Sequence, residues 1–436
     1  MASETWTGRS VAVPAVSAPS TVACLRSLGR RGVRTIVLSD HETTPGSRSA
    51  YCDENVPVPS PHDDLIAYRD ALLSVAMRPD VATIIPVRDV DVYVLSKYRD
   101  AFSEHVYPLW PTLDTLEHVQ DRIRLFETAD EAGVVTPTTG LLEDDTEWDR
   151  EWIVKARYSI LTNEYVDHYA PAQYRDPPKT EYLRPGVEPD VERLHRRMGH
   201  VPLVQEYVPT TDEYGFFALY EHGEPVATFQ HRQRRGYSYA GGASSFRESV
   251  SIPALEDAGR SLLDRLEWHG LAMVEFLRDD TTGEFKLMEI NPRFWSSLPF
   301  SVQAGADFPY YYWLLATDER ERIDDSYEPG VAGHLLRGEL LHLHSVLTDD
   351  VELVEKPSVP ETVGEILWSV VKHPRFDYAR LDDLRPFVRD LLNAYGETRA
   401  KYRPERSDPE ESNPNTDALS EPDETGNPAD GSVSVD

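Results

Sequence analysis

The sequence predicts a mixed fold in which an α/β unit precedes an antiparallel α+β body and a helical C-terminal region. Short apolar strands alternate with helices over about the first 115 residues, which is the pattern of a parallel sheet. Strand pairs joined by polar turns follow up to about residue 330, and apolar residues then recur at helical spacing. The 436 residues are enough for two or three domains around a large buried core.

The α/β unit, expected over residues 1–115, begins with an apolar run at 11–16 that predicts a buried strand. Residues 21–31 carry apolar side chains at helical spacing and 33–38 predict a second strand, which together form a βαβ unit. The pattern continues with a helix at 65–77, a strand at 81–86, a helix at 89–102 and a short strand at 106–110. No GxGxxG sequence follows the first strand, so a dinucleotide site is not supported.

The body, expected over residues 116–330, is predicted to be antiparallel. Helices are expected at 112–132 and 258–268, and strands at 152–155, 201–208, 216–220, 224–232, 271–278 and 284–290. Residues 163–190 are rich in Tyr and Pro and are expected to form a long loop or flap.

The C-terminal region, expected over residues 331–402, is predicted to contain helices at 333–347, 362–371 and 381–395. Residues 403–436 consist largely of Pro, Asp, Glu, Ser and Asn, with almost no apolar side chains. Such a segment cannot bury enough surface to offset its ordering entropy, so it is expected to be a disordered acidic tail.

The chain is strongly acidic and poor in lysine. Its formal net charge is −32, and only seven of its 44 Lys and Arg residues are lysines. Because an acidic surface stays hydrated in concentrated salt, where repulsion is screened, this composition indicates a protein from a salt-accumulating halophile. A merely acidic soluble protein is the alternative. Nucleic acid is a poor partner in either case, since no broad basic face is present to release counterions.

Cys24 and Cys52 are the only cysteines, and their spacing matches neither a CxxC pair nor a zinc site, so both are expected to be small buried side chains. No apolar run approaches the ~20 residues needed to span a bilayer. Residues 11–16 are too short for the apolar core of a signal peptide. We therefore expect a cytoplasmic protein without a membrane partner.

A candidate metal site lies on the predicted hairpin of residues 271–290. Glu275 stands between apolar strand residues, where a carboxylate costs several kcal/mol unless it is paired or ligates a cation. Glu289, Asn291 and Arg293 are spaced by two and so point to one face, and the hairpin lets Glu275 lie close to Glu289. Two carboxylates and an amide oxygen suit Mg²⁺, or Mn²⁺ in its place, and the arginine suits a phosphate oxygen. A structural Glu–Arg ion pair on a sheet surface is the alternative.

Two further segments are candidates for holding a nucleotide. Lys155 ends an apolar strand, where a lone cation can bind phosphates, although a solvated surface lysine is the simpler interpretation. In the strand at 201–208, backbone groups of Glu206 and Val208 can hydrogen-bond an adenine, and Gln205 is available for its exocyclic amine. That string alone is weakly specific.

An arginine cluster precedes a Gly/Ser-rich loop at residues 231–245. Its members Arg232, Arg234 and Arg235 can clamp anionic substrate groups or an acyl-phosphate intermediate, while the glycines allow close backbone approach. Of these, Arg235 is the candidate to stabilise the intermediate. An arginine patch neutralised by surrounding acids is the alternative.

The order of these segments resembles the ATP-grasp superfamily over about residues 10–330. The resemblance rests on Asp121-Arg122 followed by Ala132-Gly133-Val-Val-Thr-Pro137, on Trp152-Ile-Val-Lys155, on Val204-Gln-Glu-Tyr-Val208, on Glu213 as a ribose-binding acid, on Glu275, Glu289 and Asn291 as Mg²⁺ ligands, and on Arg293 as the phosphate-side arginine. The most similar branch is that of predicted carboligases related to the carbamoyl-phosphate synthase large chain and to carboxylate–amine ligases. Arg122 departs from the pattern because a lysine is usual there, and residues 161–190 have no clear counterpart.

The resemblance implies a pre-ATP-grasp domain at residues 1–115 and an ATP-grasp domain at 116–330, whose subdomains at about 116–205 and 206–330 clasp ATP. It implies an ATP-dependent ligase that uses Mg²⁺ and activates a small-molecule carboxylate as an acyl phosphate for attack by an amine. Arg122, Lys155, Gln205, Glu206, Val208 and Glu213 would hold ATP, and Arg293 and Arg235 would act on the transferred phosphoryl group.

Dimers are common among similar proteins, so a homodimer is possible. A small-molecule kinase and a non-catalytic nucleotide-binding regulator are the alternatives, and the two substrates stay unidentified.

Overall fold

The structure is a computed structural model that describes residues 9–15, 18–142, 148–351 and 354–401, with side chains up to residue 394. By its internal contacts the chain divides after Tyr395. The expected acidic tail at 403–436 lies outside the described residues. None of the described helices combines the length and the apolar composition that a membrane span requires.

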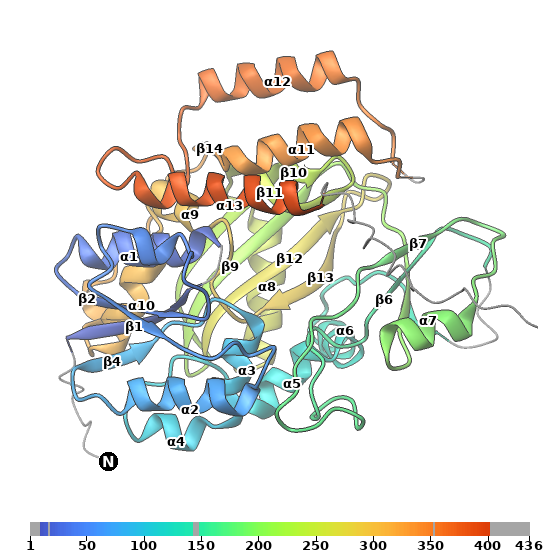
Figure 1. Ribbon diagram of the computed structural model, residues 1–436. Helices are drawn as coiled ribbons and strands as arrows, with labels where there is room; N and C mark the ends of the chain where they lie inside the picture. Colours follow the sequence, from blue (N-terminus) through green and yellow to red (C-terminus); the bar gives the residue numbers. More distant parts are fainter. Residues whose placement is uncertain (1–8, 16–17, 143–147, 352–353, 402–436) are drawn as a thin grey trace, which may run out of the picture. The chain divides into compact units, whose positions relative to one another are not determined.

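The N-terminal part is a parallel four-stranded sheet in the order β3-β2-β1-β4. Its elements are β1 (Ser10–Ala15), α1 (Pro19–Gly29), β2 (Arg34–Ser39), a 3-10 turn η1 (Gly46–Arg48), β3 (Glu54–Pro57), α2 (Leu65–Ala76), β4 (Val81–Ile84), α3 (Asp89–Lys97) and α4 (Arg99–Ser103). Alternate residues of β1 point to opposite faces, so Val11 and Val13 pack in one core cluster with α1 and Ala12 in another with α2. The helices therefore lie on both faces of the sheet (Figure 1).

A second four-stranded sheet, in the order β5-β8-β6-β7, is antiparallel. It is built from β5 (Thr139–Leu141), β6 (Trp152–Lys155), β7 (Glu181–Leu183) and β8 (Leu203–Glu206), with helices α5 (Leu113–Gln120), α6 (Arg122–Glu131) and α7 (Val191–Met198) in the same part of the chain. The predicted long loop is present, except that it contains the short strand β7.

The third sheet has six strands in the order β13-β12-β9-β10-β11-β14, all antiparallel to their neighbours. The strands are β9 (Glu213–Glu221), β10 (Glu224–Ser238), β11 (Gly241–Ser249), β12 (Gly270–Arg278), β13 (Phe285–Asn291) and β14 (Ala332–His334). Between them lie α8 (Pro253–Arg265), α9 (Leu298–Gln303), α10 (Phe308–Ala316) and the 3-10 turn η2 (Arg320–Arg322). Both expected hairpins, β9–β10 and β12–β13, are present.

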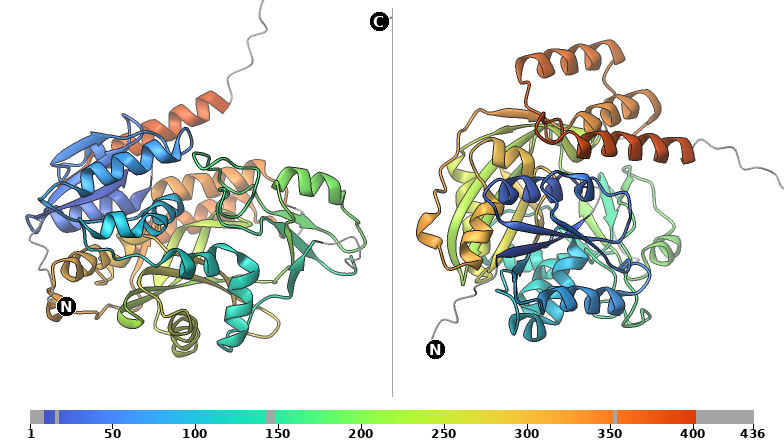
Figure 2. Two further views of the ribbon diagram at one scale, coloured as in Figure 1. Left: turned by 90° about the horizontal axis from the view of Figure 1, so that it is seen from below. Right: turned by 60° about the vertical axis from the view of Figure 1, so that its left-hand side comes forward.

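The C-terminal region contributes α11 (Leu336–Thr348), α12 (Val359–Lys372) and α13 (Arg385–Lys401). Helix α11 packs on β10 and β11, and α12 packs on α11. In Figure 1, and in the right-hand view of Figure 2, α12 lies beyond α11 as seen from the six-stranded sheet. The predicted helical character of this region is confirmed, with the difference that β14 precedes α11.

One apolar core joins the N-terminal sheet to the six-stranded sheet. A single cluster contains Ile36 and Tyr93 from the first part together with Phe216 and Val274 from the third, all fully or nearly fully buried. Each such side chain stabilises the fold by roughly 1.5–3 kcal/mol relative to exposure. The two parts are therefore held rigidly together, which fixes the residues placed between them.

Three sequence-based expectations about local structure are wrong. Residues 89–102 form two helices, α3 and α4, which are separated at Tyr98. Residues 106–110 form no strand, because Val106, Leu109 and Trp110 are apolar to fill the core and the Trp110 indole donates to the carbonyl of Leu95 (2.9 Å). Residues 112–132 form two helices rather than one. Asp121 has extended backbone angles, ends α5, and its carboxylate caps α6 by accepting from the N–H of Ile123 (3.1 Å).

Candidate functional site

A cavity of about 750 Å³ lies where the antiparallel four-stranded sheet faces the six-stranded sheet. It brings together ten of the eleven residues that the sequence singled out. These are Arg122, Lys155, Glu206, Val208, Glu213, Arg235, Glu275, Glu289, Asn291 and Arg293. Gln205 is the one that does not line it. The cavity is thus built from segments spread over more than 170 positions of the chain.

The two carboxylates are neighbours because β12 and β13 pair with Glu275 opposite Glu289. The side-chain nitrogen of Asn291 bridges them, donating to Glu275 Oε1 (3.1 Å) and to Glu289 Oε1 (3.3 Å). Burial, reinforced by the nearby charge of Glu289, raises the pKa of Glu275. Although burial alone would raise the pKa of Glu289 as well, the charges of Arg122 and Lys155 and the hydrogen bond from Arg122 hold it below its usual value. The pair therefore carries one firmly ionised carboxylate and one that readily holds a proton.

Two cations face this pair from the four-stranded sheet and α6. Arg122 donates from Nη2 to Glu289 Oε2 (2.9 Å) and from Nη1 to the carbonyl of Ala156 (2.9 Å). Lys155 is only 8% exposed and forms no ion pair within the described residues. Burial, followed by the charge of Arg122, lowers the pKa of Lys155 to about 7. The nearby charges of Glu289 and Glu275 act in the opposite direction without restoring the usual pKa, so the fold holds this buried lysine at a cost. Such a group lining a cavity is a candidate for binding an anion.

Arg293 is held by a residue of the N-terminal part. Its Nε donates to Asp89 Oδ2 (2.8 Å) and its Nη2 donates to Asn291 Oδ1 (2.9 Å). The carboxylate of Asp89 raises the pKa of Arg293, although burial alone would lower it. Asp89, the first residue of α3, was not predicted, because no local pattern links two residues 204 positions apart.

The strand that was expected to hold adenine has one free backbone donor at the cavity. The N–H of Glu206 donates to the carbonyl of Thr138 (2.9 Å) and that of Tyr207 to Glu151 (3.0 Å). The N–H of Val208 has no hydrogen-bond partner within the described residues. Gln205 points to the other face of β8, where its Nε2 donates to Thr139 Oγ1 (2.8 Å) and its Oε1 stays unpartnered.

The far end of the cavity is formed by β10, β11 and the turn that joins them. Burial raises the pKa of Glu213 to about 7, and Gln233 Nε2 donates to its Oε2 (2.9 Å). Arg235 lines the cavity, but its guanidinium is bound to the buried Glu339 of α11 (2.8 Å). Its neighbour Arg234 also lines the cavity, is exposed and forms no ion pair within the described residues. Strand alternation in the sequence could not identify Arg234 as the arginine that is free at the cavity, because the pairing of β10 is irregular between Gln233 and Gly236.

Comparison with known proteins agrees with this architecture. Residues 200–332, which contain β8 to β13, match a family model described as ATP-grasp in the biosynthetic pathway with Ter operon. The structure is similar to N5-carboxyaminoimidazole synthetase from Staphylococcus aureus, with a TM-score of 0.54 and 14% identity over 74% of this chain and 81% of that chain. The chain has the ATP-grasp fold.

Two other solved ATP-grasp structures are similar to a like degree. The biotin carboxylase domain of 2-oxoglutarate carboxylase from Hydrogenobacter thermophilus, solved with MgADP, ADP and bicarbonate, gives a TM-score of 0.55 and 15% identity over 74% of this chain and 73% of that chain. L-amino acid ligase from Bacillus licheniformis gives 0.54 and 13% over 74% and 78%. No curated protein matches the sequence. At these identities the likeness establishes the ATP-grasp fold, and the predicted fold class is confirmed.

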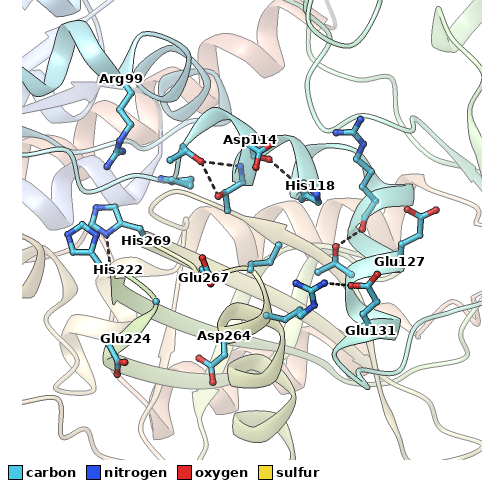
Figure 3. Close-up of a pocket in the computed structure, with 18 residues that line it drawn as sticks. Arg99, Asp114, His118, Glu127, Glu131, His222, Glu224, Asp264, Glu267 and His269 are labelled. Carbon is cyan, nitrogen blue, oxygen red and sulfur yellow. Dashed lines mark hydrogen bonds and ion pairs between the residues drawn. The ribbon is translucent and has the colours of Figure 1, made fainter.

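A larger cavity, of about 1230 Å³, lies elsewhere in the ATP-grasp fold and contains none of the predicted residues (Figure 3). Its polar side chains largely satisfy one another. Arg265 pairs with Glu131, His118 contacts the carbonyl of Asp114 (2.8 Å), and the N–H of His222 donates to His269 (3.1 Å). The 750 Å³ cavity, with its buried lysine and its carboxylate pair, is therefore the better candidate for an active site.

The donor atoms at the wall of that candidate site fit a hard divalent cation. Glu275 and Glu289 supply carboxylate oxygens side by side, and Asn291 can supply its amide oxygen if the amide turns, since its nitrogen faces them now. The described residues contain no group of three or more His, Cys, Asp or Glu that could enclose a metal. A cation bound here would therefore keep water or phosphate oxygens in its shell, which is the habit of Mg²⁺.

Proposed function

We propose that this protein is an ATP-dependent ligase, which activates a carboxylate as an acyl phosphate for attack by an amine or a similar nucleophile. The observation that carries the proposal is the placement of Lys155, Glu275 and Glu289 on facing sheets around one cavity. The solved structures of similar fold include an N5-carboxyaminoimidazole synthetase and an L-amino acid ligase, which supports a ligase reaction. The predicted roles of individual residues are part of the proposal.

In this proposal the adenine lies against β8, where the free N–H of Val208 donates to a ring nitrogen. Lys155 and Arg122 neutralise phosphate oxygens from the four-stranded sheet. Glu275, Glu289 and Asn291 hold Mg²⁺, which when bound neutralises phosphate charge and orients the terminal phosphoryl group. Because phosphoryl transfer needs positioning and charge neutralisation more than covalent help, no protein nucleophile is required.

The acceptor carboxylate is proposed to bind at the β10–β11 end of the cavity. Arg234 lines that end, forms no ion pair within the described residues and suits a carboxylate, while Arg293 lies beside Asn291. The turn passes through Gly241 and Gly242 with φ of 112° and 92°, a backbone that L side chains rarely adopt. A side chain at Gly241 would also meet Glu213, with a Cβ only 2.9 Å from Glu213 Oε1. The glycines therefore keep this end open.

The reaction is tested by phosphate release from ATP in high-KCl buffer with Mg²⁺, with candidate carboxylates and amines supplied singly and in pairs. A ligase is expected to release phosphate at a sustained rate only when both substrates are present. Phosphorylated product from one substrate alone would identify a kinase. Nucleotide binding without turnover for any pair would favour the non-catalytic regulator instead.

Replacing Arg122 tests whether this arginine binds ATP phosphates, as the lysine that is usual at this position would. Arg122→Lys is expected to raise KM for ATP by about tenfold, because one ammonium cannot reach both the Ala156 carbonyl and Glu289 as the guanidinium fork does. Arg122→Leu should raise it further. The matched control is Arg157→Lys, since Arg157 is paired with Asp121 nearby but does not line the cavity. A wild-type KM in Arg122→Leu would remove Arg122 from the nucleotide site.

A further inference from the structure

The exposed apolar side chains of this chain are concentrated in its C-terminal helices. Among the described residues, 17 large hydrophobic side chains are exposed, and 12 of them lie between Leu340 and Leu392. That stretch is about an eighth of the chain. The remaining surface is dominated by acidic residues, as the net charge of −32 requires. Such a local concentration is unusual for a soluble monomer.

Helix α12 carries the centre of this apolar surface. Leu367 and Trp368 are each 62% exposed and Val371 is 80% exposed, and their spacing places them on one side of the helix. The residues that α12 buries are the small polar Thr362 and Ser369. Val363, Ile366 and Val370 are half-buried. An ordinary surface helix covers its large apolar residues, whereas α12 leaves a further group of them exposed to solvent. The helix is built to have its outer face covered.

The size of the surface matches a stable protein–protein contact. With roughly 100 Å² for each of the 12 exposed side chains, the exposed apolar area of this stretch sums to on the order of 1,000 Å², spread over α11, α12, α13 and the segment just before α13. A standard interface buries about 800 Å² from each partner. The exposed apolar side chains of these elements together therefore offer enough area for an interface of standard size.

The composition of the chain narrows what can cover this surface. Residues 402–436 contain only Tyr402, Leu419, Val433 and Val435 as larger apolar residues, too few to cover 12 exposed ones. Anionic lipid and nucleic acid are repelled by a chain of net charge −32. A second copy presents the same apolar surface, and a two-fold contact makes such a surface self-complementary.

Two carboxylates of α12, Glu361 and Glu365, are exposed, whereas three other acidic side chains of the region are turned inward. The acidic side chains of Asp377, Asp383 and Asp390 are nearly fully buried and pair with Arg247, Arg26 and Arg337 respectively. These three buried, paired carboxylates therefore add no net charge at the proposed contact. We propose that α12, together with the exposed apolar side chains of α11 and α13, is the surface through which two copies of this chain form a dimer.

The same helix borders the candidate active site. Glu365 of α12 lines the 750 Å³ cavity, as does Val354 just before the helix. Since α12 packs mainly on α11 within one copy, a second copy is what fixes its outer side. The dimer contact therefore supports the wall of the cavity as well as covering the apolar surface.

The proposal is tested by sedimentation velocity of the full chain at tens of micromolar in high-KCl buffer. The wild-type chain is expected to sediment as a dimer, with twice the 49.4 kDa of one copy. The double variant Trp368→Glu, Val371→Glu is expected to be monomeric, with a dissociation constant raised by at least about a hundredfold, because two central residues of an interface are lost. Both side chains are exposed, so the circular dichroism spectrum should not change.

The control is Met77→Glu, which introduces the same charge at a residue that is 59% exposed and lies at the end of α2. It is expected to leave the dimer intact. A monomeric wild-type chain under these conditions would overturn the proposal, as would a double variant that still dimerises. Wild-type binding to neutral or anionic vesicles that the double variant loses would assign the surface to a membrane and would also reject the proposal.

Discussion

Replacing Glu289 by Gln is expected to lower the Mg²⁺-dependent turnover of ATP by about a thousandfold or more. The substitution keeps the size of the side chain and removes the charge that Arg122 and Lys155 hold ionised. A neutral amide is a much weaker ligand for Mg²⁺ than a carboxylate. The loss should appear as weaker Mn²⁺ binding measured by electron paramagnetic resonance in the presence of ATP, as well as in the rate of phosphate release.

The control for this substitution is Glu248→Gln on the same six-stranded sheet. Glu248 is also paired with an arginine, Arg232 (3.2 Å), but it does not line the cavity. Turnover is expected to stay within about twofold of wild type, the usual range for a partly exposed ion pair. If Glu289→Gln kept full Mg²⁺-dependent activity, the simpler interpretation of a structural Glu–Arg pair would hold, and the metal would have to lie elsewhere.

The carboxylate pair could be predicted because its chemistry is local in the sequence. Glu275 and Glu289 belong to two strands joined by a short turn, so strand alternation and one hairpin are enough to bring them together. Apolar neighbours make a carboxylate at Glu275 conspicuous. The same reasoning places Asn291 correctly, two residues beyond Glu289, on the same face of β13.

Other parts of the site depend on contacts that no local pattern contains. Asp89 holds Arg293 from a helix of the N-terminal part, and Glu339 holds Arg235 from the C-terminal region. Such pairs follow only from how separate layers pack. Gln205 is the reverse case, a residue that was predicted at the site but does not line the cavity. Adjacent residues of a strand point to opposite faces. Because Glu206 lines the cavity, Gln205 is directed away from it.

The fold shows the same division between local and tertiary information. The strand–helix order was readable from periodicity, whereas the run at 106–110 resembles a strand only because the core needs apolar side chains there. The break at Asp121 was hidden within a helical pattern. It becomes clear from the structure, where Arg157 binds the capping carboxylate with Nε at 2.9 Å and Nη2 at 2.6 Å.

Replacing Lys155 by Met is expected to abolish nucleotide binding while making the empty protein more stable. Burial lowers the pKa of Lys155 from 10.5 to about 7, which means that the folded chain holds this charge at a cost. Removing it is expected to raise the free energy of unfolding at pH 7 by roughly 2–4 kcal/mol. Between pH 7 and 10.5 the unfolded chain binds a proton at Lys155 that the folded chain lacks, so this group makes wild-type stability rise with pH. The variant should lose that part of the slope in urea unfolding measured across this range.

Lys286→Met provides a control in which the opposite sign is expected. Lys286 is bound to Glu206 (2.8 Å) and to the nearly buried Asp279 (3.0 Å), so its removal leaves carboxylates unpaired and should destabilise the protein by about 1–3 kcal/mol. Saturating ATP should raise the thermal midpoint of wild type but not of Lys155→Met, because ligand stabilises only a fold that binds it. A residue kept for structure would destabilise the chain when lost. Greater stability together with lost binding would therefore show that Lys155 is retained for an anionic ligand, and reduced stability of Lys155→Met would show that it is not.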